Sequence, residues 1–306
     1  LPGGCAIGTR PVDLHLFALK KLGAKIKIKN GYIIAEAKKG LKGAKINFPS
    51  ISVGATENAL LAAFNAKGKT ILNNCAIEPE VIDLIKFLKK LGGKIKIEGR
   101  KIYINKCEKM KRNVIHDVIF DRIELGTYMV AAALVGKKIT FNKIDPKIVR
   151  TETNILKMMG VKIKLLRNSI EIKKSQNIKR ISISTKPYPG FPTDLQAQFM
   201  VLMTRAKGLS KIKENIFENR FMHISELKRM GADIKLNGSK IKIKGVKQIF
   251  GAEVMATDLR ASSSLIIAGL MAKGLTTVNR VYHLDRGYEN LEKKLQNCGA
   301  KIWRVS

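Results

Sequence analysis

The chain has 306 residues, of which 45% are hydrophobic and 27% charged, and it contains four cysteines and four histidines. This length and composition predict a folded protein of roughly two domains. The longest apolar run, at 129–135, is too short to cross a bilayer, so we expect a soluble, cytoplasmic protein without membrane insertion. The cysteines and histidines are scattered and form no CxxC pair, which argues against a disulfide framework and a metal site.

The net charge of +34 raises the question of a nucleic-acid partner. Many of the lysines alternate strictly with isoleucine, at 25–30, 94–99 and 240–245. This alternation is typical of half-buried strands whose isoleucines face a core and whose lysines face solvent. The charge is spread over several strands and aromatic residues make up only 6% of the chain. We therefore expect no nucleic-acid partner, and a basic nucleic-acid-binding repeat protein remains the alternative from a different functional class.

Along the chain, amphipathic helices that end in glycine alternate with such strands. The junction of helix, glycine and strand recurs with separations of 69, 68, 71 and 68 residues, at Gly23, Gly92, Gly160, Gly231 and Gly299. Helices rich in alanine and leucine end at a second set of glycines with nearly the same period, Gly68, Gly136, Gly208 and Gly274. Glycine suits the left-handed residue that follows a helix. The long, regular period predicts repeated α/β units that share buried faces.

The first repeat is short on its N-terminal side. Only 22 residues precede Gly23, and the chain opens with LPGGCAIGTRPVD rather than with methionine. Comparison with the later repeats predicts that an N-terminal part of the protein is missing from this sequence. The opening stretch is therefore interpreted as an interior loop.

Three predicted helix starts carry polar clusters. FDRIELG, at 120–126, offers Asp121 with Glu124 three residues later, and FPTDLQAQF, at 191–199, offers Thr193 with Gln196 in the same relation. Both spacings predict a capping box. Asp194 lies in the first turn of the second helix, and the stretch ATDLRASSS places Asp258 and Arg260 at a third helix start. Capping and compensation of the helix dipole explain such acids without any function, and both interpretations remain open.

Arginines recur at one position of the repeat. Arg10, Arg220 and Arg286 lie 13, 11 and 13 residues before the glycine that ends the next helix. A lone arginine is a surface residue by default, but arginines at equivalent turns of repeats around an axis would converge and suit a phosphate or carboxylate ligand. Backbone N–H groups at 3–5 and 52–55 would add to such an anion site. Cys5 lies among glycines near Arg10, which favours a reachable thiol over an inert one.

Six stretches resemble, in order, the signature stretches of the UDP-N-acetylglucosamine 1-carboxyvinyltransferase family: LPGGCAIGTRPVDLH, SVGAT, FPTDLQAQF, FENRFMH, ATDLRAS and YHLDRGYE. The resemblance covers the whole chain and its motifs are long. It implies the inside-out α/β barrel of the enolpyruvyl transferases, an α/β fold with two domains of repeated βαβαββ-type units about pseudo-threefold axes. Residues 1–119 would form an incomplete substrate and lid domain that carries the cysteine loop, and 120–306 the second domain.

The resemblance also implies site residues. Cys5 would be the general acid on a mobile loop and the residue that fosfomycin alkylates, and Asp194 would take the proton from the sugar hydroxyl. Arg10, Arg260 and the catalytic Arg286 would hold phosphoenolpyruvate, and Arg220 would support them. The stretch from Arg10 to Leu14 would lie at the uracil end, 50–54 at the diphosphate and Ile216 in the sugar-nucleotide pocket. The other implied substrate-binding residues are Pro11, Val12, Asp13, Leu14, Ser50, Ile51, Ser52, Val53, Gly54 and Asp258.

The implied reaction is transfer of the enolpyruvyl group of phosphoenolpyruvate to the 3'-hydroxyl of UDP-N-acetylglucosamine, with release of phosphate, as the first committed step of peptidoglycan synthesis. It needs a base, an acid and fixed positive charge but no cofactor or metal, and its partners are these two small molecules. The alternative within the same chemistry is a 3-phosphoshikimate 1-carboxyvinyltransferase-like enzyme. Members of the resembled family carry about one hundred further N-terminal residues, judged by the missing repeat portion. These residues include a lysine, an asparagine and an arginine that contact the substrates, so we expect this chain alone to form an incomplete active site.

Overall fold

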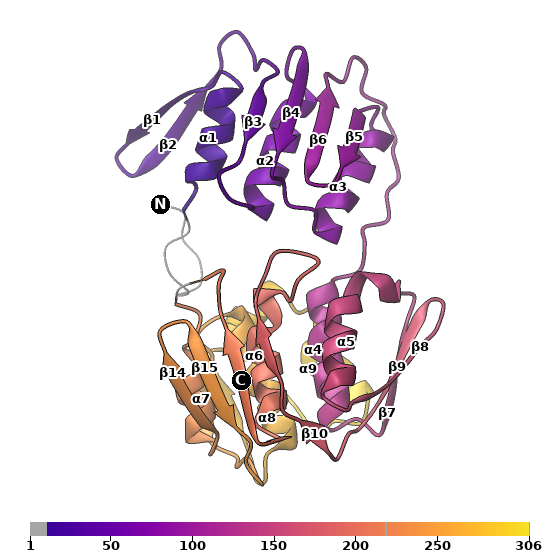
Figure 1. Ribbon diagram of the computed structural model, residues 1–306, viewed down its shortest axis with the longest axis vertical. Helices are drawn as coiled ribbons and strands as arrows, with labels where there is room; N and C mark the ends of the chain where they lie inside the picture. The colour runs from indigo at the N-terminus through magenta and orange to yellow at the C-terminus, as the bar shows by residue number, and fades with distance from the viewer. Residues whose placement is uncertain (1–10, 218, 306) are drawn as a thin grey trace. The chain divides into compact units, whose positions relative to one another are not determined.

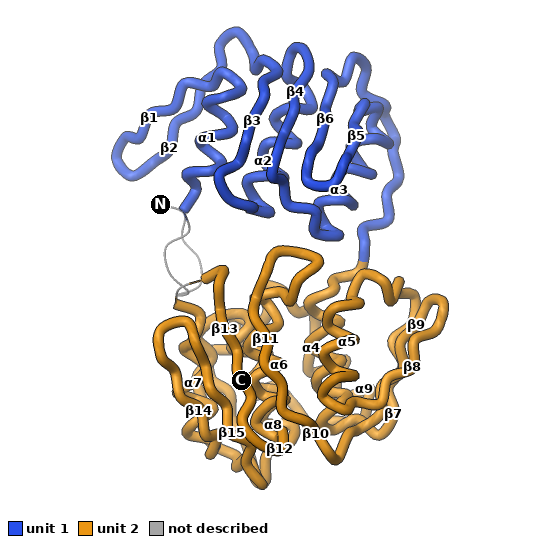
Figure 2. The backbone as a smooth tube through the Cα atoms, viewed as in Figure 1, with its two compact units in different colours: residues 1–3, 9–119 blue, residues 4–8, 120–306 orange. Residues whose placement is uncertain are grey.

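Residues 11–217 and 219–305 are described in the computed structural model, which divides into two compact units (Figure 1, Figure 2). Unit 1 ends at Ile119 and unit 2 begins at Phe120. No helix in the described ranges is long and apolar enough to span a membrane. The separate functional roles expected for 1–119 and 120–306 stay predictions.

Unit 1 contains a complete βαβαββ repeat that follows a helix and a hairpin. The first part consists of α1 (Asp13–Lys21), β1 (Lys25–Lys29) and β2 (Tyr32–Glu36). The repeat consists of β3 (Lys45–Asn47), α2 (Val53–Phe64), β4 (Lys69–Asn73), α3 (Pro79–Lys90), β5 (Lys94–Glu98) and β6 (Lys101–Asn105). Its sheet has the order β3-β4-β6-β5, in which β3 is parallel to β4 and the other pairs are antiparallel.

Unit 2 continues the repeat with variations. Its first part consists of α4 (Arg122–Leu134), β7 (Lys138–Asn142), the 3₁₀ turn η1 (Pro146–Val149), α5 (Arg150–Met158), β8 (Lys162–Leu165) and β9 (Ser169–Lys173). The second part consists of β10 (Ile178–Lys179), β11 (Ser182–Ser184), η2 (Thr193–Leu195), α6 (Gln196–Met203), β12 (Ala206–Lys207), β13 (Leu209–Lys213), α7 (His223–Arg229), β14 (Asp233–Asn237) and β15 (Lys240–Lys244). The third part consists of β16 (Glu253–Met255), α8 (Leu259–Met271), β17 (Thr277–Asn279), η3 (Val281–Arg286) and α9 (Leu291–Asn297).

The sheets confirm the predicted repeated units. The sheet β11-β13-β15-β14 has the same order, and the same parallel and antiparallel pairings, as the sheet of unit 1. Strands β7, β9 and β8 form an antiparallel sheet, and β16 pairs in parallel with β17. The residues that follow helices α1, α3, α5, α7 and α9 adopt φ values between 86° and 107°, at Gly23, Gly92, Gly160, Gly231 and Gly299, which only glycine adopts without strain.

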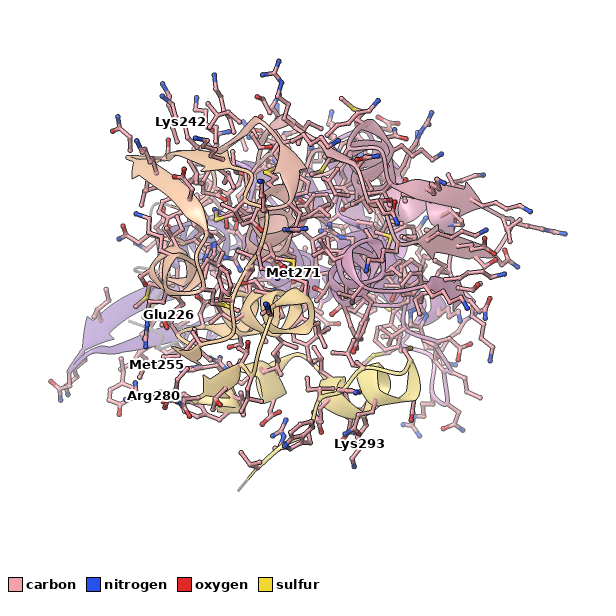
Figure 3. The ribbon with its side chains drawn as sticks, turned by 90° about the horizontal axis from the view of Figure 1, so that it is seen from below. Glu226, Lys242, Met255, Met271, Arg280 and Lys293 are labelled. Atoms are coloured by element: carbon pink, nitrogen blue, oxygen red, sulfur yellow. The ribbon has the colours of Figure 1, made fainter. Side chains whose placement is uncertain are left out.

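The Lys/Ile alternation produces the expected half-buried strands only where another strand completes the sheet. In β15, Ile241 and Ile243 are fully buried, and Lys242 lies on the outer side of the strand (Figure 3). In the hairpin β1–β2, by contrast, the side chain of Ile28 is 72% exposed. The prediction of a buried face is wrong there, because β1 and β2 form a two-stranded sheet that no further described strand extends.

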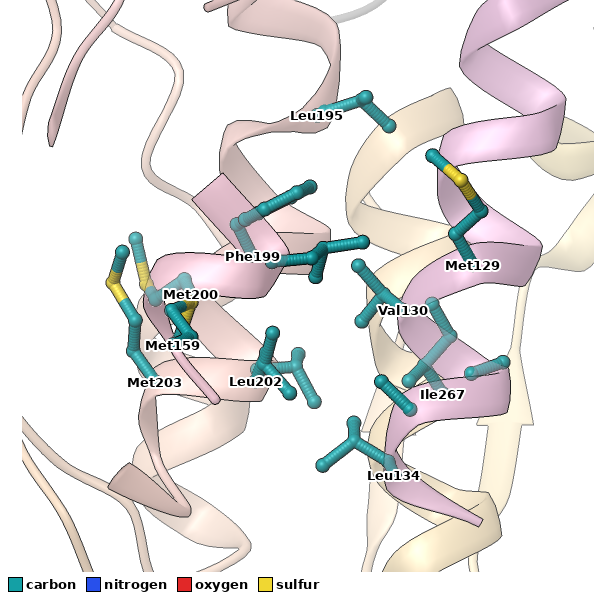
Figure 4. Close-up of a cluster of buried hydrophobic side chains, with 14 of the residues drawn as sticks. Met129, Val130, Leu134, Met159, Leu195, Phe199, Met200, Leu202, Met203 and Ile267 are labelled. Atoms are coloured by element: carbon teal, nitrogen blue, oxygen red, sulfur yellow. The ribbon is translucent and has the colours of Figure 1, made fainter. Parts of the chain in front are cut away.

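Helices α4, α6 and α8 form the centre of unit 2 and contact one another. Helices α4 and α6 are buried along nearly their whole length and α8 along its central part, as expected for helices with little polar surface. Val130 of α4, Phe199 and Leu202 of α6 and Ile267 of α8 belong to one cluster of buried side chains (Figure 4). The rigid packing of these three helices fixes the positions of their N-terminal ends.

The outer helix α7 is tied to the chain segment that leads into α8. The carboxylate of Glu226, in α7, accepts a hydrogen bond from the N–H of Met255, in β16, at 3.0 Å (Figure 3). Because β16 directly precedes Asp258 and α8, this contact links the second and third parts of unit 2 beside the polar cluster described next.

Candidate active site

Polar side chains lie at the N-terminal ends of the three central helices. Asp121 accepts hydrogen bonds from two backbone N–H groups at the start of α4, at 2.7 and 3.0 Å. Asp258 does the same at the start of α8, with both distances 2.9 Å. These two carboxylates are therefore N-caps, and their helix starts are determined locally.

The predicted Thr193–Gln196 capping box is wrong. Helix α6 is preceded by the 3₁₀ turn η2, and no side chain caps it. The hydroxyl of Thr193 instead donates to Glu214 Oε2 at 3.0 Å and accepts from Arg220 Nη1 at 3.2 Å. These long-range partners replace the local cap, because a carboxylate and a guanidinium form stronger hydrogen bonds than a backbone amide does.

Asp194 lies between two guanidinium groups. Its Oδ1 accepts a hydrogen bond from Arg220 Nη1 at 2.6 Å, and its Oδ2 accepts one from Arg260 Nη2 at 3.1 Å. The arginine side chains are almost buried, whereas the side chain of Asp194 is 36% exposed. The structure therefore places one partly exposed carboxylate against two positively charged side chains that are themselves almost buried.

The charges around Asp194 determine its protonation state. Burial alone would raise the pKa of its carboxyl group, but the charges and hydrogen bonds of Arg220 and Arg260 outweigh burial and hold the pKa at about 2. The carboxylate is therefore ionised at neutral pH. Any anion that draws the guanidinium groups away from it would raise this pKa and make the carboxylate a stronger base.

Glu214 fixes the segment that carries Arg220. Its carboxylate is almost fully buried and accepts hydrogen bonds from Thr185, Thr193 and the N–H groups of Ile216 and Phe217, at 2.7, 3.0, 2.8 and 3.3 Å. The four donors come from η2, the end of β11 and the chain after β13. The Glu214 carboxylate therefore links the chain segments that carry Asp194 and Arg220.

Replacing Glu214 by alanine should lower the free energy of unfolding by about 3 kcal/mol, because one buried and three partly buried donors lose their acceptor. Urea unfolding followed by circular dichroism measures this loss. Glu253→Ala is the matched control, because Glu253 is an exposed glutamate that accepts one hydrogen bond, from Asn279 at 2.8 Å. A loss for Glu214→Ala no greater than that of the control would refute the assigned role.

His223 is buried beside this cluster, and its Nε2 atom has no hydrogen-bond partner among the described residues. Burial lowers the pKa of His223 to about 4, the carboxylate of Asp258 opposes this shift, and the charge of Arg220 adds to it. The unfolded chain takes up this proton near pH 6.5, and the folded protein takes it up only near pH 4. The free energy of unfolding is therefore unaffected by this group above pH 6.5 and decreases as the pH falls from 6.5 toward 4.

We expect the wild-type protein to lose about 2 kcal/mol more stability between pH 7 and pH 5 than a His223→Gln variant loses. Urea titrations of both proteins at these two pH values measure the difference. Comparing the change within each protein removes any constant destabilisation caused by the substitution. Equal losses in the two proteins would exclude His223 as the titrating group.

The predicted nucleotide-binding stretches of unit 1 lie next to each other. Ser52 caps α2, and its Oγ accepts a hydrogen bond from a backbone N–H of the first turn at 3.3 Å. A Cβ atom at Gly54 would lie 2.9 Å from Nε2 of His15, in α1, so the absence of a side chain at Gly54 leaves room for the His15 ring. The segments 11–14 and 50–54 therefore form adjacent helix starts, where backbone N–H groups are available to an anion.

The remaining predicted site residues are only partly brought together. Of the arginines expected to converge, Arg220 reaches Asp194, and the second guanidinium comes from Arg260. Arg286 is the exposed last residue of η3, and the side chain of Ile216 is partly exposed while its N–H binds Glu214. Cys5 and Arg10 lie outside the described residues.

Sequence reasoning missed Glu214 and Tyr288. Tyr288 accepts a hydrogen bond from Arg260 Nη1 at 3.1 Å, through its hydroxyl group. Tyr288 lies within the stretch YHLDRGYE, two residues after Arg286, and Glu214 lies three residues before the stretch FENRFMH and six before Arg220. Their position beside these arginines was the available signal.

Comparison with known proteins places this geometry in a family. The family model for EPSP synthase (3-phosphoshikimate 1-carboxyvinyltransferase) matches residues 1–295. The chain is 58% identical to the UDP-N-acetylglucosamine 1-carboxyvinyltransferase of Pelagibacter ubique (strain HTCC1062), over all of this chain and 73% of that protein. It is 53% identical to the enzyme of the same name from Endomicrobium trichonymphae, over 99% of this chain and 72% of that protein.

A solved structure agrees with these matches. The enolpyruvyl transferase NikO from Streptomyces tendae superposes with a TM-score of 0.88 at 25% identity, over 96% of this chain and 72% of that one. The fold is therefore the predicted α/β fold of the enolpyruvyl transferases. The chain belongs to the EPSP synthase (3-phosphoshikimate 1-carboxyvinyltransferase) family, and within it to the UDP-N-acetylglucosamine 1-carboxyvinyltransferases.

Proposed function

We propose that the protein transfers the enolpyruvyl group of phosphoenolpyruvate to the 3'-hydroxyl of UDP-N-acetylglucosamine and releases inorganic phosphate. The observation that carries the proposal is the half-exposed carboxylate of Asp194 held between Arg220 and Arg260. A base next to fixed positive charge is what this reaction requires, since an alcohol must lose a proton beside a trianionic substrate. The names of the relatives at 58% and 53% identity support the choice of this donor and acceptor.

In the proposed reaction, Asp194 accepts the proton of the 3'-hydroxyl while the hydroxyl oxygen bonds to C2 of phosphoenolpyruvate. Cys5 donates a proton to C3, which gives a tetrahedral intermediate. This intermediate then returns a proton from C3 to the Cys5 thiolate and expels phosphate with the electron pair of the C2–O bond, which restores the double bond. Asp194 passes the proton of the 3'-hydroxyl to the departing phosphate, so both side chains regain their starting protonation states.

The arginines bind the donor in this proposal. Arg10, Arg260 and Arg286 hold its phosphate and carboxylate groups, and Arg220 keeps its place against Asp194 and Thr193. When phosphoenolpyruvate binds Arg260, the interaction of Arg260 with Asp194 weakens. The pKa of Asp194 then rises from about 2 toward the range of a useful general base. The carboxylate thus gains basicity only when the substrate is present.

Residues proposed to bind the acceptor occur in each of the two units, considered separately. The stretches 10–14 and 50–54 take the uracil and diphosphate ends, and their described residues, 11–14 and 50–54, lie at the starts of α1 and α2. In unit 2, Ile216 and Asp258 line the part of the site that takes the sugar nucleotide. We further propose that the reaction serves peptidoglycan synthesis in the cytoplasm, and through it cell shape and division.

Phosphate release tests the proposal and its alternative. The protein as its gene encodes it is incubated with phosphoenolpyruvate and either UDP-N-acetylglucosamine or shikimate 3-phosphate, and the phosphate is quantified. Shikimate 3-phosphate is the alternative acceptor because the description of the matching family model names it. Release that depends on the nucleotide sugar supports the proposal, and release only with shikimate 3-phosphate overturns it.

A further inference from the structure

A buried phenol occupies the point where the three central helices of unit 2 meet. The side chain of Tyr288 is almost completely inaccessible, and its hydroxyl lies 2.8 Å from the hydroxyl of Thr127, in α4, and 3.2 Å from that of Ser263, in α8. Nε2 of Gln198, in α6, is 3.4 Å away. Arg260 Nη1 completes this set at 3.1 Å.

The hydrogen atoms available in this network determine which way the phenol donates. Thr127 uses its hydroxyl hydrogen on the carbonyl oxygen of Ile123 at 2.9 Å, and Ser263 uses its own on the carbonyl oxygen of Arg260 at 3.0 Å. Each hydroxyl has a single hydrogen. The phenol must therefore donate to Thr127 or Ser263, which leaves its lone pairs free to accept from Arg260.

The backbone brings Tyr288 to this position through a close approach. A Cβ atom at Gly287 would lie 2.9 Å from a methyl group of Leu259, the first residue of α8. The N–H of Tyr288 bonds to the carbonyl oxygen of Leu284 at 3.0 Å, and its ring packs in a cluster with Leu284 and Leu291. The phenol is therefore held by its backbone and its ring independently of Arg260.

One terminal nitrogen of the Arg260 guanidinium group is thus bound by the neutral hydroxyl of Tyr288, and the other by the charged carboxylate of Asp194. Its Nη1 donates to Tyr288 and its Nη2 to Asp194, and its guanidinium carbon lies 5.6 Å from the centre of the Tyr288 ring. A planar guanidinium whose two terminal nitrogens are both engaged cannot rotate about its Nε–Cζ bond without breaking a hydrogen bond. The plane in which Arg260 presents its charge is therefore fixed by the phenol.

We infer that Tyr288 is a positioning residue for the reaction: its hydroxyl holds the guanidinium of Arg260 in the orientation that meets both Asp194 and the anionic donor. The inference rests on the proposed function for its kinetic consequence. The structural part of the inference, that Tyr288 restrains Arg260, does not depend on which acceptor substrate the enzyme uses.

The kinetic test uses Tyr288→Phe, which removes only the hydroxyl oxygen. The kcat/KM for phosphoenolpyruvate should fall about tenfold or more, because a buried hydrogen bond to a charged group is lost, and the KM for UDP-N-acetylglucosamine should change less than twofold. Thr127→Val is the matched control, since it removes a neighbouring hydroxyl of the network that does not contact the Arg260 side chain. Its kcat/KM should stay within about twofold of wild type.

A double-mutant cycle separates positioning from general destabilisation. If Tyr288 acts through Arg260, then Tyr288→Phe introduced into an Arg260→Lys background should lower kcat/KM by less than about twofold further. A full tenfold loss in that background, or an equal loss in Thr127→Val, would overturn the inference.

A second readout does not require activity. NMR of protein labelled with ¹⁵N in arginine measures the rotation rate about the Nε–Cζ bond of Arg260, and the Arg260→Lys variant assigns the signal. Rotation should be at least about ten times faster in Tyr288→Phe than in wild type, and unchanged in Thr127→Val. If the wild-type protein releases no phosphate, the proposed function is wrong. The rotation rate still shows whether Tyr288 restrains Arg260. An unchanged rotation rate in Tyr288→Phe would contradict it.

Discussion

Replacing Asp194 by asparagine is expected to lower kcat by about 10³-fold, because an amide cannot accept the proton of the acceptor hydroxyl. The KM for phosphoenolpyruvate should stay the same or decrease. Arg260 loses its internal anion in this variant and becomes fully available to the donor. Steady-state kinetics, with the concentrations of both substrates varied, measures kcat and this KM separately.

Asp145→Asn is the control for this substitution. Asp145 also lies at a helix start in unit 2, where it accepts one backbone hydrogen bond at 2.9 Å, from Lys147. No ion pair of Asp145 is present among the described residues, and we expect its activity to stay within about twofold of wild type. An Asp194→Asn variant that retains more than a tenth of the wild-type kcat would show that another group is the base.

Replacing Arg220 by methionine is expected to lower kcat/KM for phosphoenolpyruvate by about 10²–10³-fold. Methionine fills similar space, but Asp194 and Thr193 lose the guanidinium that they share. The pKa of Asp194 then rises, since one of its two neighbouring charges is gone. The optimum of the pH–rate profile should accordingly move to higher pH on its acidic side.

Arg205→Met serves as the comparison for Arg220→Met. Arg205 donates to the carbonyl oxygen of Val246 at 3.0 Å, so its loss removes a partly buried arginine contact of unit 2 without touching Asp194. We expect reduced stability with kcat/KM near the wild-type value for this variant. Equal kinetic losses in the two variants would mean that Arg220 acts only by stabilising the fold.

The repeat, its helix-ending glycines and two of its helix caps were predictable because their signals are local. The glycines that end the helices recur at a fixed spacing, and each adopts the positive φ that its position requires. Asp121 and Asp258 cap the helices that their sequences indicate. A cap and a helix end depend on only a few neighbouring residues, so the sequence determines them directly.

The failed predictions all concern contacts between distant residues. Thr193 has the spacing of a cap, but Glu214, 21 residues later, takes its hydrogen. Ile28 has the pattern of a half-buried strand, but its exposure depends on whether another strand covers it. The hydrogen-bond partners of the Tyr288 hydroxyl could not be predicted, because they lie 161, 90 and 25 residues away in the sequence.

The arginine pattern was partly informative. Equal positions in the repeat predicted a convergence of Arg10, Arg220 and Arg286. Within the part of the chain that the structure describes, Arg220 reaches Asp194, but its companion Arg260 comes from a helix start rather than from an equivalent turn. Positions that differ between the repeats therefore supply the positive charge around this one carboxylate.

The product of the reaction provides the most direct test of the account. The protein as its gene encodes it is incubated with UDP-N-acetylglucosamine and phosphoenolpyruvate labelled with ¹³C at C2 and C3, and the product is followed by NMR. We predict an enol ether in which the labelled C2 is attached to the 3'-oxygen of the sugar, formed by the wild-type protein and not detectably by Asp194→Asn. Attachment of the label to a different acceptor, or undiminished product from Asp194→Asn, would contradict the account.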